Sequence, residues 1–77
     1  MKAIKTAAEQ FADEIKGKAH VICGGLKGLA KPMGCSAATV YTRIKAPQTI
    51  TIEELREIRR TVGISQEDMA ALIKPML

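Results

Sequence analysis

The chain has 77 residues, a formal net charge of +4 at pH 7 and a pI near 9.3. We expect one domain, residues 1–77, near the lower size limit for a hydrophobic core without disulfide or metal support. No apolar run approaches the roughly 20 residues that span a membrane, and the opening MKAIKTAAEQ lacks the apolar segment of a secretory signal. We therefore expect a cytoplasmic protein.

The sequence offers little for metal binding or catalysis. Cys23 and Cys35 lack CxxC or Cys/His metal spacing, and His20 with Cys23 cannot fill a tetrahedral zinc site. The glycine-rich segment 24–28 has neither the preceding strand nor the GK[ST] ending of a phosphate-binding loop. We expect buried free thiols, no metal, no cofactor and no enzymatic activity.

Composition and apolar spacing indicate a helical protein. Apolar residues make up 47% of the chain and are mainly aliphatic, which favours small, closely packed helices over a sheet. We expect an all-α fold, a compact bundle of about five short helices. The first helix is predicted over residues 2–23, with Gly17 as a candidate break. Its apolar residues at helical spacing are Ile4, Ala8, Phe11, Ile15, Ala19 and Ile22.

The second predicted helix, residues 26–33, carries two unfavourable residues. Gly28 costs about 1 kcal/mol and Pro32 about 3 kcal/mol in a helix interior. We therefore expect this helix to be kinked or shortened. Gly34 ends it, because glycine adopts the left-handed conformation at little steric cost.

The third predicted helix, residues 37–45, begins after Ser36, whose hydroxyl can cap the first turn. Val40 and Ile44 are four residues apart and face the core, and Cys35 packs in the turn before them. The residues on the opposite, outward face are Ala37, Ala38, Tyr41, Thr42 and Lys45.

Two further helices are predicted after a loop that begins at Pro47. Thr51 and Glu54 form a capping box for residues 52–62, and Ser65 caps residues 66–73. Residues 75–77 form a tail. The residues predicted to be buried in the longer helix are Ile52, Leu55, Ile58 and Val62, and those predicted to be exposed are Glu53, Arg56, Glu57, Arg59 and Arg60.

Charge is divided along the chain. Asp and Glu occur only in residues 9–14 and 53–68, so no acid lies between Ile15 and Ile52. The basic residues inside this acid-free segment are Lys16, Lys18, Lys27, Lys31, Arg43 and Lys45. Such a field attracts polyanions; the alternative is an ordinary lysine-rich surface in contact with water.

The two short helices around Gly34 resemble a helix-turn-helix. Ala30 lies four residues before the glycine, Cys35 directly after it and Val40 six residues after it. The run GCSAATVYTRIKAPQTITIEELREI is similar to the phage Cro and lambda-repressor-like (XRE) DNA-binding domains, over roughly residues 11–73. The resemblance implies a phage or prophage-type transcriptional regulator that places helix 37–45 in the major groove of DNA.

The resemblance also implies roles for single residues. Ser36, Ala37, Ala38, Tyr41 and Thr42 would face base edges or adjacent phosphates, and Tyr41 could instead pack on a neighbouring helix. These side chains include no bidentate partner for a base, so specificity is expected to be modest or to depend on DNA shape. The expected phosphate contacts are Arg43, Lys45, Lys27 and Lys31.

Double-stranded operator DNA is the expected partner, bound by a homodimer. The residues expected at the dimer contact are Met69, Leu72, Ile73, Met76 and Leu77, which could instead complete a small core. The rival hypothesis is a protein-interaction module, an antirepressor or antitoxin-like adaptor that reuses the same fold.

Overall fold

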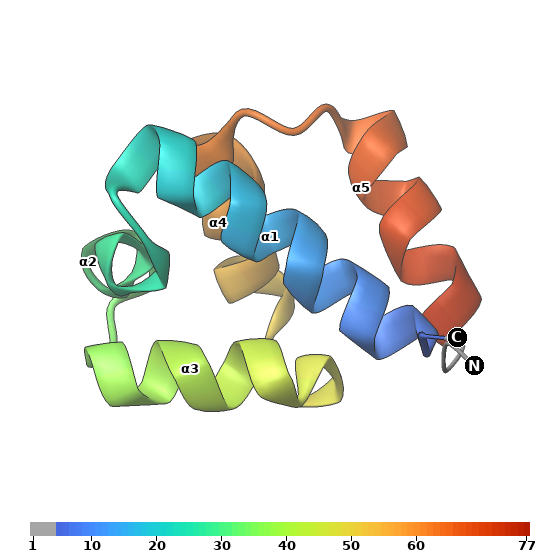
Figure 1. The fold of residues 1–77 in the computed structure, drawn as a ribbon, viewed down its shortest axis with the longest axis horizontal. Helices are drawn as coiled ribbons and strands as arrows, with labels where there is room; N and C mark the ends of the chain where they lie inside the picture. The colour runs from blue at the N-terminus through green and yellow to red at the C-terminus, as the bar shows by residue number, and fades with distance from the viewer. Residues whose placement is uncertain (1–4) are drawn as a thin grey trace.

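The computed structural model describes residues 5–77, and this part of the chain folds as an all-α bundle without strands. Five α-helices and three short 3₁₀ turns follow one another along the chain, so the predicted fold class is confirmed. Figure 1 shows α3 along one edge of the molecule, with α1 and α4 above it and α5 at one end. The elements are α1 (Ala7–Cys23), η1 (Leu26–Leu29), α2 (Ala30–Met33), α3 (Ala37–Lys45), η2 (Pro47–Thr49), α4 (Ile52–Val62), α5 (Gln66–Ile73) and η3 (Lys74–Met76).

Helix α1 begins later than the sequence predicted. Thr6 accepts a hydrogen bond from the Glu9 backbone N–H, and the Glu9 carboxylate accepts one from the Thr6 N–H, so a capping box fixes the start at Ala7. The predicted helical residues 2–4 lie outside the described residues. The helix continues through Gly17 without a break and ends at Gly24, which has a φ of 75°.

The apolar stripe predicted for α1 is confirmed in the middle of the helix, whereas Ala8 is only half-buried and Ile4 lies outside the described residues. Phe11, Ile15 and Ala19 are buried, and Cys23 continues the four-residue spacing by packing against the core. Ile22, which the sequence placed on the stripe, is exposed instead. Three successive steps of four residues keep Cys23 on the buried side, whereas the step of three from Ala19 turns Ile22 toward solvent.

The expected weakness of residues 26–33 is confirmed. A 3₁₀ turn, η1, replaces the first half of the predicted helix, and α2 is a single turn. Pro32 is the third residue of α2, where a backbone N–H has no partner within the helix, so the proline removes no helical hydrogen bond. Gly28 lies so close to Cys23 that a Cβ there would be 2.5 Å from the Cys23 Cβ. Glycine at position 28 thus allows η1 to approach the end of α1 closely.

Helices α4 and α5 have the predicted bounds. Thr51 and Glu54 form the predicted capping box, and Ser65 accepts a hydrogen bond from the Asp68 N–H. Ile52 corrects the prediction, because it is 72% exposed. As the first residue of α4, it lies beyond the edge of the core that the later turns bury.

Leu55, predicted to be buried, is half-buried against the core, and three further residues differ from the prediction. Glu57 and Arg59 are half-buried rather than exposed, and Arg59 Nη1 donates to the Ile64 carbonyl oxygen at 3.2 Å. The predicted tail contains a 3₁₀ turn, η3, in which Met76 packs against the core.

The core contains residues from every α-helix: Phe11, Ile15, Ala19, Leu26, Leu29, Met33, Val40, Ile44, Ile58, Val62, Ile64 and Met69. Within residues 5–77, no helix combines the length and apolar character needed to cross a membrane.

Candidate nucleic-acid interface

Helix α3 presents a face of small, uncharged side chains at the edge of the molecule. Val40 and Ile44 are buried beneath it, as the spacing predicted. On the outer side, Ser36, Ala37, Ala38 and Thr42 are exposed. Tyr41 is 52% exposed and lines a cleft together with residues of α1. The predicted direction of both faces is therefore confirmed, and we call the outer side the α3 face.

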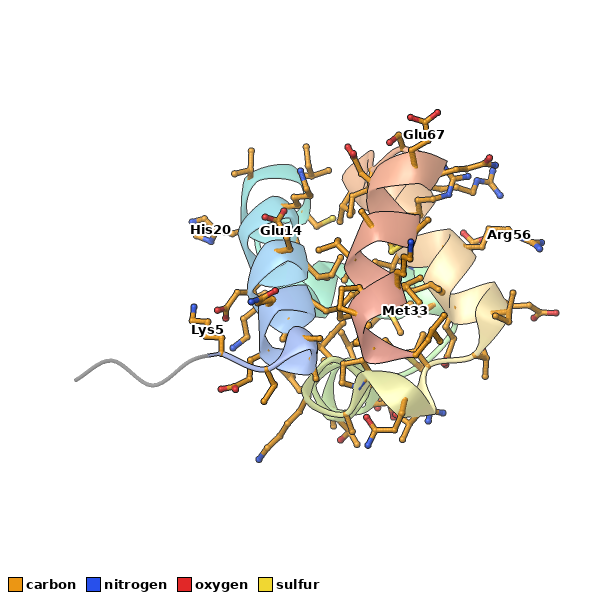
Figure 2. All side chains as sticks on the ribbon, turned by 90° about the vertical axis from the view of Figure 1, so that its right-hand side faces the viewer. Lys5, Glu14, His20, Met33, Arg56 and Glu67 are labelled. Carbon is orange, nitrogen blue, oxygen red and sulfur yellow. The ribbon has the colours of Figure 1, made fainter. Side chains whose placement is uncertain are left out.

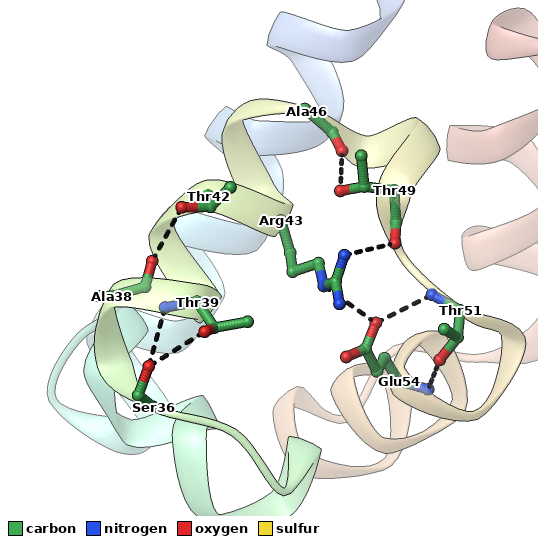
Figure 3. A network of polar contacts seen from close by, with 9 residues as sticks. All are labelled: Ser36, Ala38, Thr39, Thr42, Arg43, Ala46, Thr49, Thr51 and Glu54. Carbon is green, nitrogen blue, oxygen red and sulfur yellow. Dashed lines mark hydrogen bonds and ion pairs between the residues drawn. The ribbon is translucent and has the colours of Figure 1, made fainter.

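Local hydrogen bonds hold the polar side chains of this face. The Ser36 hydroxyl accepts from the Thr39 N–H at 3.2 Å and lies 3.0 Å from the Thr39 hydroxyl, as Figure 3 shows. The Thr42 hydroxyl donates to the Ala38 carbonyl oxygen at 3.1 Å. Each hydroxyl oxygen keeps lone pairs and remains exposed. The face thus offers hydrogen-bonding groups of fixed direction beside two exposed methyl groups.

Three lysines near the α3 face are available to an anion. Lys45 lies at the end of α3, and Lys27 and Lys31 lie on η1 and α2, both of which pack against α3. All three are exposed, and none forms an ion pair within residues 5–77. In Figure 2, Glu67 lies at the opposite end of the molecule from α3.

A cleft of about 640 Å³ is lined by residues of α3 and of the first half of α1. Tyr41 and Lys45 line it from α3, and its acids, Glu9 and Asp13, come from α1. Both acids are engaged. Hydrogen bonds from the Thr6 backbone and side chain lower the pKa of Glu9, and the hydrogen bond and charge of Lys5 lower the pKa of Asp13. Lys5 therefore compensates the charge of Asp13, whereas the Glu9 carboxylate stays charged and is held by the capping box at the start of α1.

Arg43, expected at a phosphate, makes its contacts within the protein. Its Nη1 donates to the Thr49 carbonyl oxygen at 3.0 Å, and its Nε lies 3.4 Å from Oε1 of Glu54 (Figure 3). The Nε is buried and does not have hydrogen-bond geometry with any described residue. Arg43 therefore differs from Lys45, two residues further along the same helix.

The residues expected at a dimer contact are divided between core and surface. Met69 is buried, and Leu72, Ile73 and Met76 are half-buried against the core. Leu77 is exposed. Met69 is thus part of the core and corrects the expectation that this side chain lies on a contact surface.

Sequence reasoning missed two polar arrangements around the site. The Thr6–Glu9 capping box has the same Thr-x-x-Glu spacing as Thr51–Glu54 and could have been found from that signal. The Arg43–Glu54 pair joins residues on two different helices and has no local pattern.

Within the described chain, no group of three or more His, Cys, Asp and Glu side chains could hold a metal ion. Cys23 and Cys35 are free and half-buried, less enclosed than expected.

Comparisons with protein-family models, with curated proteins and with solved structures return no match to this chain. The likeness to Cro and lambda-repressor-like domains thus depends on the residues of the chain itself, and the site is interpreted from its own geometry.

Proposed function

We propose that the protein binds double-stranded DNA and acts as a transcriptional regulator in the cytoplasm, with the α3 face in the major groove. The observation that carries the proposal is the combination of a small, exposed, uncharged helix face with flanking unpaired lysines. The first turn of α3 carries only small side chains on its outer side, Ala37 and Ala38 after Ser36, and no acid, so it can approach base edges closely, because the major groove admits one α-helix.

The proposed contacts follow from side-chain chemistry. Ala37 and Ala38 present methyl groups to thymine C5-methyl groups, and Ser36 and Thr42 donate to or accept from bases or nearby phosphates. Tyr41 hydrogen-bonds a phosphate. Lys27, Lys31 and Lys45 neutralise phosphates on either side of the helix. Base specificity is modest and depends partly on DNA shape, because the face lacks bidentate side chains.

The proposed complex is a homodimer on a site with two-fold symmetry. A single 77-residue domain contacts few bases, and two copies placed one helical turn apart double the contacts. Leu77 and the exposed parts of Leu72, Ile73 and Met76 are the candidate contact between copies.

The test measures binding of fluorescent duplex DNA by anisotropy at several salt concentrations. If Lys27, Lys31 and Lys45 each contact a phosphate, the logarithm of the affinity falls with the logarithm of the salt concentration with a slope of about −2.7 per domain, since each contact contributes about 0.9. Selection of bound sites from a random duplex pool then gives the target, and a palindrome supports the dimer. Affinity that does not change with salt contradicts the proposal.

One observation favours the rival hypothesis of a protein-interaction module. Val21 is 78% exposed, and Ile22 beside it on α1 is also exposed, which makes an apolar surface away from the α3 face. The rival predicts a protein complex that Val21→Ser disrupts and that salt hardly affects. A salt-resistant protein complex that is lost in Val21→Ser, together with no duplex binding by the original chain, would favour this rival over the DNA-binding proposal.

A further inference from the structure

We propose that Arg43 is a positioning residue that fixes the angle of α3 through Glu54 and Thr49, and that its guanidinium does not contact DNA. The inference rests on the proposed function, because the angle of α3 matters for a helix that enters a groove. It replaces the sequence-based expectation of a phosphate contact at Arg43. The observation that carries it is the direction of the guanidinium, into the angle between α3 and α4 (Figure 3).

The contacts of Arg43 connect parts of the fold that are otherwise weakly connected. The elements packed closely against α3 are α1, η1, α2 and η2, and α4 is not among them in the described chain. The Arg43 side chain links α3 to the start of α4. Its Nη1 binds the carbonyl oxygen of Thr49, in the loop after α3, and its Nε lies 3.4 Å from the Glu54 carboxylate, in the first turn of α4.

Glu54 is held in place for this contact. Its Oε1 accepts the Thr51 backbone N–H at 2.9 Å in the capping box, and its side chain is 13% exposed. The same oxygen is the atom nearest to Arg43 Nε. The Thr51 N–H and the Arg43 guanidinium thus share one oxygen of Glu54. This oxygen connects the start of α4 to the second half of α3.

The guanidinium is poorly placed for a phosphate. The Arg43 side chain is 32% exposed and its Nε is buried, whereas Lys45 is exposed on the same helix. A phosphate at Arg43 would also lie near the Glu54 carboxylate, and two negative groups repel each other. Moving the guanidinium out to DNA would leave the Thr49 carbonyl oxygen and Glu54 without this partner.

The experiment compares Arg43→Gln, Glu54→Gln, the double variant and Lys45→Ala in duplex binding at several salt concentrations. Glutamine at 54 removes the charge but keeps an oxygen that can accept the Thr51 N–H, so the α4 cap survives. If Arg43 positions α3, each glutamine variant lowers the affinity for the selected duplex about tenfold, within the range for coupled residues. The salt slope stays as in the original chain, and the double variant is no weaker than either single one.

A phosphate contact predicts a different pattern. Arg43→Gln would then reduce the salt slope by about 0.9, as expected for Lys45→Ala, and Glu54→Gln would tighten binding, because it removes a negative charge near the DNA. That pair of results would overturn the proposal. Lys45→Ala is the matched control for the loss of one cation on the same helix.

A second readout needs no DNA. In ¹H–¹⁵N spectra, Arg43→Gln and Glu54→Gln are expected to shift the same backbone amides, over the second half of α3 and residues 46–51. Arg60→Gln, which removes an exposed cation of α4, is the control and should shift only amides of its own helix. Shifts confined to the substituted residues and their chain neighbours contradict the positioning role. If the protein fails to bind duplex, the proposed function is wrong, and these spectra still decide whether Arg43 holds α3.

Discussion

Helices α3 and α4 are neighbours in the chain, and both begin with a hydroxyl side chain that caps the first turn, Ser36 for α3 and Thr51 for α4. Both bury aliphatic residues on one side. Their outer surfaces differ. The α3 face is small and uncharged, with Lys45 at its end, whereas α4 carries alternating acids and arginines.

Several charged side chains of α4 make contacts within the protein. Glu57 lies 3.5 Å from Arg60, Arg59 donates to the Ile64 carbonyl oxygen, and Glu54 faces Arg43. The lysines around α3 form no such pairs within residues 5–77. Two helices of similar amphipathic pattern therefore differ in what they can bind.

The largest expected effect comes from giving the α3 face a charge typical of α4. Ala38→Glu should weaken duplex binding by at least about 100-fold, because like charges brought together at an interface cost several kcal/mol. Circular dichroism and the melting temperature should stay unchanged, since Ala38 is exposed. Ala70→Glu, an exposed alanine of α5, is the matched control and should bind nearly as the original chain does. Equal affinities for the two variants would place the DNA contact elsewhere.

The second prediction concerns η1, which packs against both α3 and α1. Gly28→Ala should destabilise the fold by about 1–3 kcal/mol, because its Cβ would meet the Cys23 Cβ at 2.5 Å and the Cys23 carbonyl oxygen at 2.6 Å. Urea denaturation measures the change. Gly17→Ala is the control, since nothing lies within 4 Å of its Cβ, and it should stabilise α1 by about 0.5–1 kcal/mol. If both substitutions stabilise the protein, η1 is not packed against α1 as described.

The two caps allow a direct comparison of α3 with α4. Ser36→Ala and Thr51→Ala should each reduce the free energy of unfolding by about 1 kcal/mol, because each removes a side-chain acceptor from the first turn. The affinity for duplex DNA should distinguish the two variants. At equal fraction folded, Ser36→Ala should lower this affinity more than Thr51→Ala does, because it removes a hydroxyl from the α3 face. The reverse order would mean that α4, and not α3, faces the DNA.

The smallest expected effect tests the single cations. Lys45→Ala should weaken binding to all duplexes alike and reduce the salt slope by about one. Arg60→Ala removes the same charge from α4, but Arg60 is paired with Glu57, so the slope should stay unchanged. The measurement is the salt dependence of anisotropy titrations. A slope that changes equally in both variants would show that only the total charge matters.

Much of the fold could be predicted from local patterns. The caps at Ser36, Thr51 and Ser65 and the glycine ends at Gly34 and Gly63 gave the bounds of the later helices, because these signals act within one helical turn. The same logic, applied to Thr6 and Glu9, would have corrected the start of α1. The outward direction of Tyr41 and Thr42 followed from the burial of Val40 and Ile44, since a helix has a fixed period.

The tertiary structure decided which apolar residues of the helical pattern stay exposed. It also decided which charged side chains of different helices form pairs. Ile52 fits an apolar pattern yet lies beyond the edge of the core, which depends on where neighbouring helices end. Arg43 and Glu54 are eleven residues apart and meet only because the loop after α3 turns α4 back toward it. Local sequence fixes backbone hydrogen bonds within a turn or two, whereas contacts between side chains of different helices depend on how the whole core packs.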